Sequence, residues 1–352
     1  MRTVVACPNW IGDAVMATPT LAALRRHFPE MHLALVARPY VVPVFDPAPY
    51  ADEIIPWGKP GGLTTRELIG RLRRDGYARG VLLTNSFRSA LVFFLGGVKQ
   101  RIGYARQWRG ALLTDRLKPA KDRGCYVPTP AITSYFDLIR PLGVKETSTK
   151  MVLYTRPADE SAADAVYGES GLEPRETLVM APGAAFGLAK CWPPARFAEI
   201  ARRARRDLDL RTLLLCSAGE RKTAETIAEL SAGAAVLPGA QPGLGTVKAV
   251  VRRSRAMVTN DSGLRHFAAA YDVPAVTIFG PTHVNWTETW FAKETKLQHM
   301  VPCGPCQKRV CPEGHLQCMN EITADEVFAA LRGLVEKYAY QARGAETVIG
   351  GA

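Results

Sequence analysis

Residues 256–279 read AMVTNDSGLRHFAAAYDVPAVTIF and divide into four short parts. An apolar stretch of strand length, 256–259, is followed by the polar turn NDSG at 260–263. Residues 264–271 fit a short helix, and residues 275–279 form a second apolar stretch. A strand, a helix and another strand in this order predict a βαβ unit, whose two strands run parallel.

The same alternation recurs on both sides of this stretch. In the same half of the chain, we predict strands at 178–181 and 212–217 and helices at 194–206 and 222–230 before this stretch, and a helix at 323–338 after it. Toward the N-terminus, we predict strands at 3–6, 32–37 and 80–84 and helices at 14–28 and 65–74. Two such series predict an α/β protein of two doubly wound, Rossmann-like domains that face a central cleft.

The boundary between the two series is polar. Residues 147–177 contain Pro157, Gly171 and Pro174, which is typical of an inter-domain linker, here with one helix near 158–169. We therefore predict a first Rossmann-like domain at 1–155, a linker at 156–176, a second Rossmann-like domain at 177–322, and a C-terminal helix with a frayed tail at 323–352.

Positive charge is concentrated in the first part of the chain. Residues 1–150 hold 22 Lys and Arg against 11 Asp and Glu, whereas residues 151–352 hold 23 against 22. A domain that receives an anionic ligand would have this imbalance. Nucleic acid is the commonest such ligand, but we find no helix-turn-helix, zinc-finger, RRM or KH signature. An anionic small molecule or a lipid head group fits equally well.

We expect neither a membrane-spanning segment nor an export signal. The N-terminus, MRTVVACPNW, has no apolar region followed by a cleavage site, and the longest apolar run, residues 90–98, is too short to cross a bilayer. We therefore expect a cytoplasmic protein, with any membrane contact being peripheral.

Two loops of the second domain could bind phosphate. In Asn260-Asp261-Ser262-Gly263, the backbone N–H groups of a following helix would face an anion, and Gly263 would allow close approach. The alternative is that Asp261 or Ser262 simply caps the helix. In PGAAFG at 182–187, a glycine turn precedes Lys190, whose ammonium could meet a diphosphate; the alternative is a solvated surface lysine.

The first domain offers one candidate base. Asp13 follows Gly12 shortly after the first strand, where a carboxylate could take a proton from an attacking hydroxyl. It could instead be a helix N-cap. The loop lacks the GxGxxG pattern, which argues against a dinucleotide-binding dehydrogenase.

Four of the eight cysteines crowd together near the C-terminus. Cys303, Cys306, Cys311 and Cys318 have the spacing C-x2-C-x4-C-x6-C, which is compatible with a structural zinc site. Reduced thiols or a redox-formed disulfide are alternatives. His315 could contribute or could merely be exposed.

Taken together, three segments resemble glycosyltransferase family 9, the bacterial lipopolysaccharide heptosyltransferases. They are PNWIGDAVMATP at 8–19, APGAAFGLAKCWP at 181–193 and TNDSGLRHFAAAYDVPAVTIFGPT at 259–282. The first is closest in form to the heptosyltransferase II branch. The resemblance implies a GT-B fold and inverting transfer from ADP-L-glycero-D-manno-heptose to the phosphorylated inner core of lipopolysaccharide. It also implies that no metal or other cofactor is required for catalysis.

The resemblance also assigns roles to residues of this chain that occupy matching positions. It implies that Asp13 is the general base and that Lys190 meets the diphosphate. The rest of the nucleotide-sugar pocket would comprise Gly183, Glu220, Asp261, Ser262, Gly263 and His266, with Glu220 directed to the ribose hydroxyls.

The acceptor is assigned to loops of the basic domain. We predict that Asn85, Ser86, Arg88, Arg101, Arg106 and Arg109 bind the anionic acceptor, because arginine suits bidentate phosphate recognition. The arginines of helix 66–74 are instead predicted to form a solvated face.

Departures from the family pattern leave alternatives open. Cys191, Leu188, Arg265 and the run 283–286 differ from the residues usual in the family. Other hypotheses are a family 9 transferase with another nucleotide sugar or acceptor, a nucleotide-sugar epimerase, and a non-catalytic RNA-binding protein. We predict that nucleic acid is not a partner.

Overall fold

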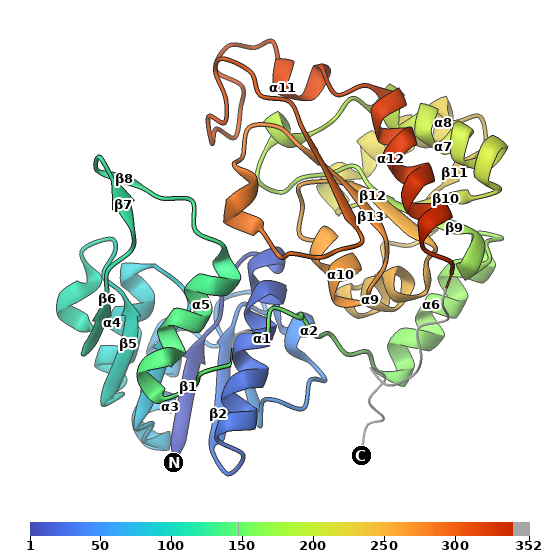
Figure 1. Ribbon diagram of the computed structural model, residues 1–352. Helices are drawn as coiled ribbons and strands as arrows, with labels where there is room; N and C mark the ends of the chain where they lie inside the picture. Colours follow the sequence, from blue (N-terminus) through green and yellow to red (C-terminus); the bar gives the residue numbers. More distant parts are fainter. Residues whose placement is uncertain (147, 341–352) are drawn as a thin grey trace. The chain divides into compact units, whose positions relative to one another are not determined.

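The computed structural model describes residues 1–146 and 148–340 and divides the chain into two units, each built on a parallel six-stranded sheet (Figure 1). The first unit comprises Met1–Tyr154 and Asn285–Thr289, and the second comprises Thr155–Val284 and the chain from Trp290 onward. The predicted α/β class, with two Rossmann-like units, is confirmed.

In the first unit the sheet has the order β3-β2-β1-β4-β5-β6. Its strands are β1 (Arg2–Ala6), β2 (His32–Ala37), β3 (Glu53–Pro56), β4 (Arg79–Leu82), β5 (Gln100–Tyr104) and β6 (Asp115–Leu117). Its helices are α1 (Ile11–His27), α2 (Val42–Phe45), α3 (Thr65–Asp75), α4 (Phe87–Leu95) and α5 (Ala131–Ile139). A small antiparallel hairpin, β7 (Lys121–Asp122) and β8 (Cys125–Tyr126), completes the unit.

Both faces of this sheet are covered. Helix α1 contacts α2 and α5, whereas α3 contacts α4 on the other face (Figure 1). The core under α3 and α4 includes Val4, Leu72 and Phe93, all buried. Strands covered on both sides are apolar nearly throughout, which explains why β1 and β2 were predicted from sequence.

Helix α3 shows how local sequence sets the element bounds. The Thr64 hydroxyl accepts a hydrogen bond from the Glu67 backbone N–H, and the Glu67 carboxylate accepts one from the Thr64 N–H. Gly76 ends the helix in the left-handed conformation, with φ of 66°, which glycine adopts without strain. Leu68 and Leu72, one turn apart, are its buried residues.

The sheet of the second unit repeats the same topology, β11-β10-β9-β12-β13-β14. Its strands are β9 (Thr177–Ala181), β10 (Arg211–Leu214), β11 (Ala235–Val236), β12 (Ala256–Asn260), β13 (Ala275–Phe279) and β14 (Glu294–Gln298). Its helices are α6 (Pro157–Glu169), α7 (Pro194–Leu208), α8 (Arg221–Leu230), α9 (Leu244–Arg253), α10 (Arg265–Ala270), α11 (Gln317–Asn320) and α12 (Ala324–Lys337).

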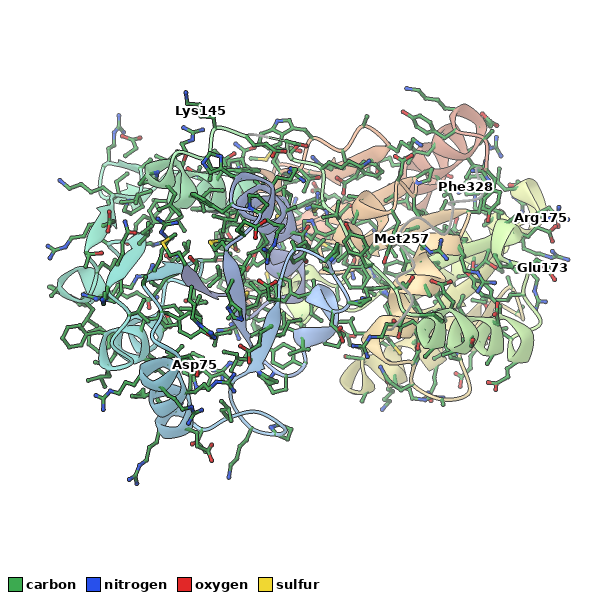
Figure 2. All side chains as sticks on the ribbon, turned by 90° about the horizontal axis from the view of Figure 1, so that it is seen from below. Asp75, Lys145, Glu173, Arg175, Met257 and Phe328 are labelled. Carbon is green, nitrogen blue, oxygen red and sulfur yellow. The ribbon has the colours of Figure 1, made fainter. Side chains whose placement is uncertain are left out.

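The helices of the second unit also form two layers. Helix α7 contacts α8 and α12, while α9 contacts α6 and α10 (Figure 1). Met257 of β12 is buried among the strands, whereas Glu173 and Arg175 lie exposed at the outer edge of the unit (Figure 2). The buried core therefore lies between the sheet and its helices.

Three predicted boundaries need correction. Residues 156–176 are not a separate linker, because α6 packs on α9 as part of the second unit. Helix α12 packs on α7 in the same unit, so it is not a separate C-terminal part. Helix α1 begins at Ile11, three residues before the predicted start, which puts Asp13 on the helix. The predicted frayed tail, the last ten or so residues, lies outside the described residues.

Candidate functional site

The candidate donor site lies where the strand order of the second sheet reverses, between β9 and β12. In sheets of this kind, ligands bind at the carboxyl ends of the strands on either side of such a point. Thr259 of β12 pairs with Ala181 of β9, so the loops that follow both strands start side by side. The Asn260 side-chain amide donates to the Pro182 carbonyl and ties the two loops together. The two predicted phosphate loops therefore meet.

Lys190 and Asp261 join across these loops. The Lys190 ammonium is buried, with 8% of the residue exposed, and it contacts the Asp261 carboxylate. Its Nζ also donates to the Asp261 carbonyl oxygen at 3.3 Å, and it lies 4.9 Å from the centre of the Phe186 ring. The interpretation of Lys190 as a solvated surface lysine is therefore wrong.

Asp261 is held in its ionised form. Burial alone would raise the pKa of its carboxyl, but the positive charges of Lys190 and Arg265 outweigh burial and lower the pKa below its usual value. The Thr282 hydroxyl donates to the same carboxylate at 2.8 Å. Thr282 was not predicted, although its position directly after Pro281 at the end of the next strand was a usable signal.

Arg265 is a structural cation of this network. Its guanidinium makes two hydrogen bonds to the Glu294 carboxylate, of 2.8 and 2.9 Å, and lies 3.6 Å from Asp261 Oδ1. Both Arg265 and Glu294 are buried. Arg265, one of the departures from the family pattern, therefore adds little net charge beside the phosphate loop, because Glu294 neutralises it. Glu294 lies on β14, a strand that sequence reasoning missed.

The other residues of the loop at 260–263 do not cap the helix that follows, α10. The N-cap position of α10 is Leu264, so neither Asp261 nor Ser262 fills it. The Ser262 hydroxyl is within 3.0 Å of the Thr259 hydroxyl. His266 is buried, and its Nδ1 has no hydrogen-bond partner among the described residues. Burial, followed by the Arg265 charge, holds the pKa of His266 well below 6.5, so the ring is neutral.

Gly183 and Glu220 are also brought together. A Cβ atom at position 183 would come within 2.0 Å of the Glu220 carboxyl carbon, so any larger residue there would displace the Glu220 side chain. Glu220 Oε2 accepts hydrogen bonds from the backbone N–H and the hydroxyl of Ser217, at 2.8 and 2.7 Å. Glu220 thus closes a capping box and also faces the glycine loop.

In the first unit, Asp13 occupies the first turn of α1 rather than its cap. Trp10 holds the N-cap position, and Asp13 is half-buried. The phenol of Tyr135, on α5, is buried, and burial together with the negative charge of Asp13 raises its pKa well above 10. Asp13 therefore lies close to a neutral tyrosine, another neighbour that the sequence did not reveal.

The switch point of the first sheet carries two of the predicted acceptor residues. Ser86, after β4, caps α4, since its hydroxyl accepts from the Ser89 N–H at 3.1 Å. Asn85 Oδ1 accepts from Arg109 at 3.2 Å. Arg109 itself is fully buried and donates to the carbonyls of Thr84 and Tyr104. The acceptor assignment of Arg109 is corrected, because its guanidinium is committed to the protein's own oxygens.

The other three predicted arginines differ among themselves. Arg101 donates to three backbone carbonyls, among them that of Leu112 at 2.6 Å, and so supports the fold rather than a ligand. Arg88 is exposed, stacks on Trp57 and bonds the Thr65 hydroxyl at 2.5 Å. Arg106 stacks 3.7 Å from the centre of the Tyr126 ring.

The four clustered cysteines line one pocket of the second unit together with His315. Each is a free thiol, and burial, followed by the neighbouring cysteines, raises the pKa of Cys318. Over residues 1–146 and 148–340, no three Cys, His, Asp or Glu side chains stand in an arrangement that would hold a metal ion. No helix within the same ranges is long and apolar enough to cross a membrane.

The sequence matches one family model and several curated relatives. The model of glycosyltransferase family 9 (heptosyltransferase) matches residues 65–317. Lipopolysaccharide heptosyltransferase 2 of Salmonella typhimurium is 26% identical over 347 residues, covering 96% of this chain and 99% of that protein. The same enzyme of Escherichia coli is 27% identical over 349 residues, covering 95% and 99%.

Solved structures agree with this similarity. The structure of E. coli ADP-heptose lipopolysaccharide heptosyltransferase II superposes with a TM-score of 0.76 at 26% identity, covering 96% of this chain and 99% of that one. A family 9 glycosyltransferase from Veillonella parvula gives a TM-score of 0.83 at 22% identity, covering 96% and 98%, which shows a common fold.

Proposed function

Because this chain belongs to glycosyltransferase family 9, the heptosyltransferases, we propose that it transfers a heptose from ADP-L-glycero-D-manno-heptose to the inner core of lipopolysaccharide. Similarity to heptosyltransferases 2 over nearly the whole chain supports this substrate pair. The observation that carries the proposal is the buried Lys190–Asp261 pair at the switch point of the second sheet, where a nucleotide would bind.

The donor diphosphate is proposed to lie against the two joined loops. Lys190 would supply a charge-assisted hydrogen bond to a phosphate oxygen, while Ser262 and Gly263 would present polar and backbone groups. The unpartnered Nδ1 of the neutral His266 is suited to pair with a ligand hydroxyl or phosphate oxygen. Glu220, next to Gly183, is proposed to meet the ribose hydroxyls.

The transfer is proposed to be a single displacement. The acceptor hydroxyl attacks the anomeric carbon as its proton passes to the Asp13 carboxylate. The bond between the anomeric carbon and the β-phosphate oxygen breaks at the same time, and ADP leaves with the bonding electrons, which inverts the anomeric centre. Negative charge grows on the diphosphate, where Lys190 stabilises it without reorganisation. No metal ion is needed for this step in the proposal.

The acceptor is proposed to bind on the basic first unit. Arg88 and Arg106 carry charges that can reach a phosphorylated sugar, and Asn85 and Ser86 lie in the loop between β4 and α4, just before Arg88. Because the acceptor is lipid-linked, we propose a cytoplasmic enzyme in peripheral contact with the inner face of the inner membrane. Basic residues near an anionic membrane surface contribute about 1 kcal/mol each.

Nucleotide selectivity tests the proposal without requiring the acceptor. Calorimetric titration should give a lower Kd for ADP than for UDP or GDP, because the pocket is proposed to be built for an adenine nucleotide. Equal affinities, or tighter UDP binding, would favour a family 9 transferase with a different donor. Binding of RNA that collapses with salt, together with no binding of any nucleotide diphosphate, would favour the RNA-binding alternative.

A further inference from the structure

The segment from Cys303 to Cys318 is long, irregular and rich in thiols. The structure describes it throughout, and residues 303–316 contain neither helix nor strand. Loops of this length without secondary structure are uncommon in compact domains unless they serve a function or are held in place by a cross-link. Here the chain brings Cys303, Cys306, Cys311 and Cys318 to the wall of one pocket.

His315 provides a second observation at the same pocket. Its Nδ1 accepts a hydrogen bond from the Gln317 backbone N–H at 2.9 Å, so in the neutral ring the hydrogen resides on Nε2. That Nε2 lies 3.9 Å from Cys303 Sγ. The ring is therefore oriented to donate to the sulfur, and such a contact stabilises a metal-bound thiolate from outside the ligand set.

We propose that Cys303, Cys306, Cys311 and Cys318 together bind one zinc ion as thiolates, with His315 supporting Cys303. Four thiolates are a complete tetrahedral set for zinc, and soft sulfur ligands select it over magnesium or calcium. The sulfurs share the pocket without converging on one point as they stand. Binding therefore draws the loop inward, and each thiol gives up its proton.

The proposed zinc site is attached directly to the donor site. The Arg309 carbonyl, between Cys306 and Cys311, accepts from the Ala189 N–H at 3.1 Å, next to Lys190. Gly187 has a φ of +153°, and a Cβ atom there would come within 2.4 Å of the same carbonyl, so glycine is needed for this contact. A zinc ion that fixes the cysteine loop would thereby hold the Lys190 loop in place.

A second contact extends the link to the other side of the donor site. The Gln307 N–H donates to the Pro281 carbonyl at 2.8 Å, and Thr282, which follows, bonds to Asp261. The cysteine loop therefore supports Ala189, next to Lys190, and Pro281, next to the Thr282 that bonds to Asp261. The effect on nucleotide binding rests on the proposed ADP site, whereas the zinc site itself does not.

Elemental analysis of the protein, purified without chelator, tests the metal site directly. About one zinc per chain is expected, and titration of the thiols with a mercurial should release it to a chromophoric chelator. The variants C306S and C311S should lose the zinc, while the matched controls C216S and C125S, cysteines outside the cluster, should retain it. Zinc-free protein that takes up no added zinc, or zinc retained in both cluster variants, overturns the site.

The coupling is tested separately on the parent protein. Zinc removal should raise the Kd for ADP several-fold, and restoring zinc should reverse the change. An unchanged Kd would show that zinc in the cysteine loop does not support the ADP site. The measured zinc content would still stand. If the protein binds zinc but no ADP in either state, the donor assignment has failed rather than the zinc site.

Discussion

The Lys190 ammonium contacts both the carboxylate and the backbone carbonyl of Asp261, although the two residues are 71 positions apart. Few charged side chains are buried this deeply unless they are paired. Arg265 contacts the same carboxylate and is itself neutralised by Glu294, so positive and negative charges alternate through the network. An incoming diphosphate would meet a lysine that is already oriented.

Replacing Lys190 separates its electrostatic role from its structural one. Lys190→Met should weaken ADP binding and slow turnover, since a hydrogen bond to a charged group contributes about 1.5–3 kcal/mol. It should also destabilise the fold by about 3–5 kcal/mol, because it leaves the Asp261 carboxylate buried beside one cation fewer. Chemical unfolding and ADP titration measure the two effects.

A double variant supplies the control for this experiment. Lys190→Met combined with Asp261→Asn removes both charges, so stability should recover relative to the single variant. The affinity for ADP should remain low. A folded double variant that binds ADP with parental affinity would show that Lys190 does not contact the donor diphosphate.

Asp13→Asn tests the proposed base. The amide keeps the shape of the side chain but does not accept a proton, so turnover should fall by about 10²–10⁴-fold while the Kd for ADP stays nearly unchanged. The assay is steady-state transfer combined with ADP titration on the same preparation. Near-parental turnover would assign Asp13 to stabilising the first turn of α1 only.

Chelation tests whether catalysis needs a metal. A few minutes in EDTA should leave initial rates unchanged, because the proposed charge stabilisation comes from Lys190 and backbone groups. A rate that falls in EDTA and returns with magnesium would contradict the metal-independent step. Zinc bound by four thiolates should exchange slowly enough to remain in place during this short treatment.

The neutral, buried His266 predicts how stability depends on pH. Its pKa is lowered in the folded state, so below about pH 6.5 the unfolded chain binds a proton that the folded chain does not. Stability should therefore fall as pH falls, by up to about 1.4 kcal/mol per unit from this group. In His266→Gln that slope should be shallower, as measured by urea unfolding from pH 7 downward. Identical slopes would contradict the buried neutral ring.

Arg88 and Arg106 are predicted to serve the acceptor. Replacing both with Gln should raise the KM for a phosphorylated core acceptor and flatten its salt dependence, with the Kd for ADP unchanged. The matched control, Arg66→Gln with Arg74→Gln, removes the same charge from the exposed face of α3. An equal effect in both pairs would indicate general attraction to anions instead of a binding site.

Much of the fold was predictable because parallel strands covered on both faces are continuous apolar runs. Strands β2 and β13 have the predicted bounds, and α3 has its capping signal in Thr64 and Glu67. Strand β14 was missed, since ETKLQ is polar and half-buried at a sheet edge. Helix α1 was predicted to start too late because its N-cap residue, Trp10, is not one of the residue types that usually cap a helix.

The site was predictable as a set of loops but not as a set of contacts. The positions of Lys190 and Asp261 after β9 and β12 follow from the strand pattern. The Arg265–Glu294 pair joins residues 29 positions apart and has no local sequence signal. The lack of a local signal also explains why Arg109 was wrongly assigned to the acceptor. Its burial depends on contacts with the carbonyls of Thr84, after β4, and Tyr104, at the end of β5. Charge in a basic domain therefore does not distinguish a structural arginine from a ligand-binding one.

The central claim is tested most directly by heptosyl transfer to a defined acceptor. Purified protein would be incubated with ADP-L-glycero-D-manno-heptose and truncated lipopolysaccharide core acceptors that end before or after the first heptose, and the products resolved by mass spectrometry. The account predicts the gain of one heptosyl residue on a phosphorylated inner-core acceptor, with one ADP released for each residue transferred. Release of ADP without transfer to any core acceptor, or transfer only from a different nucleotide sugar, would contradict it.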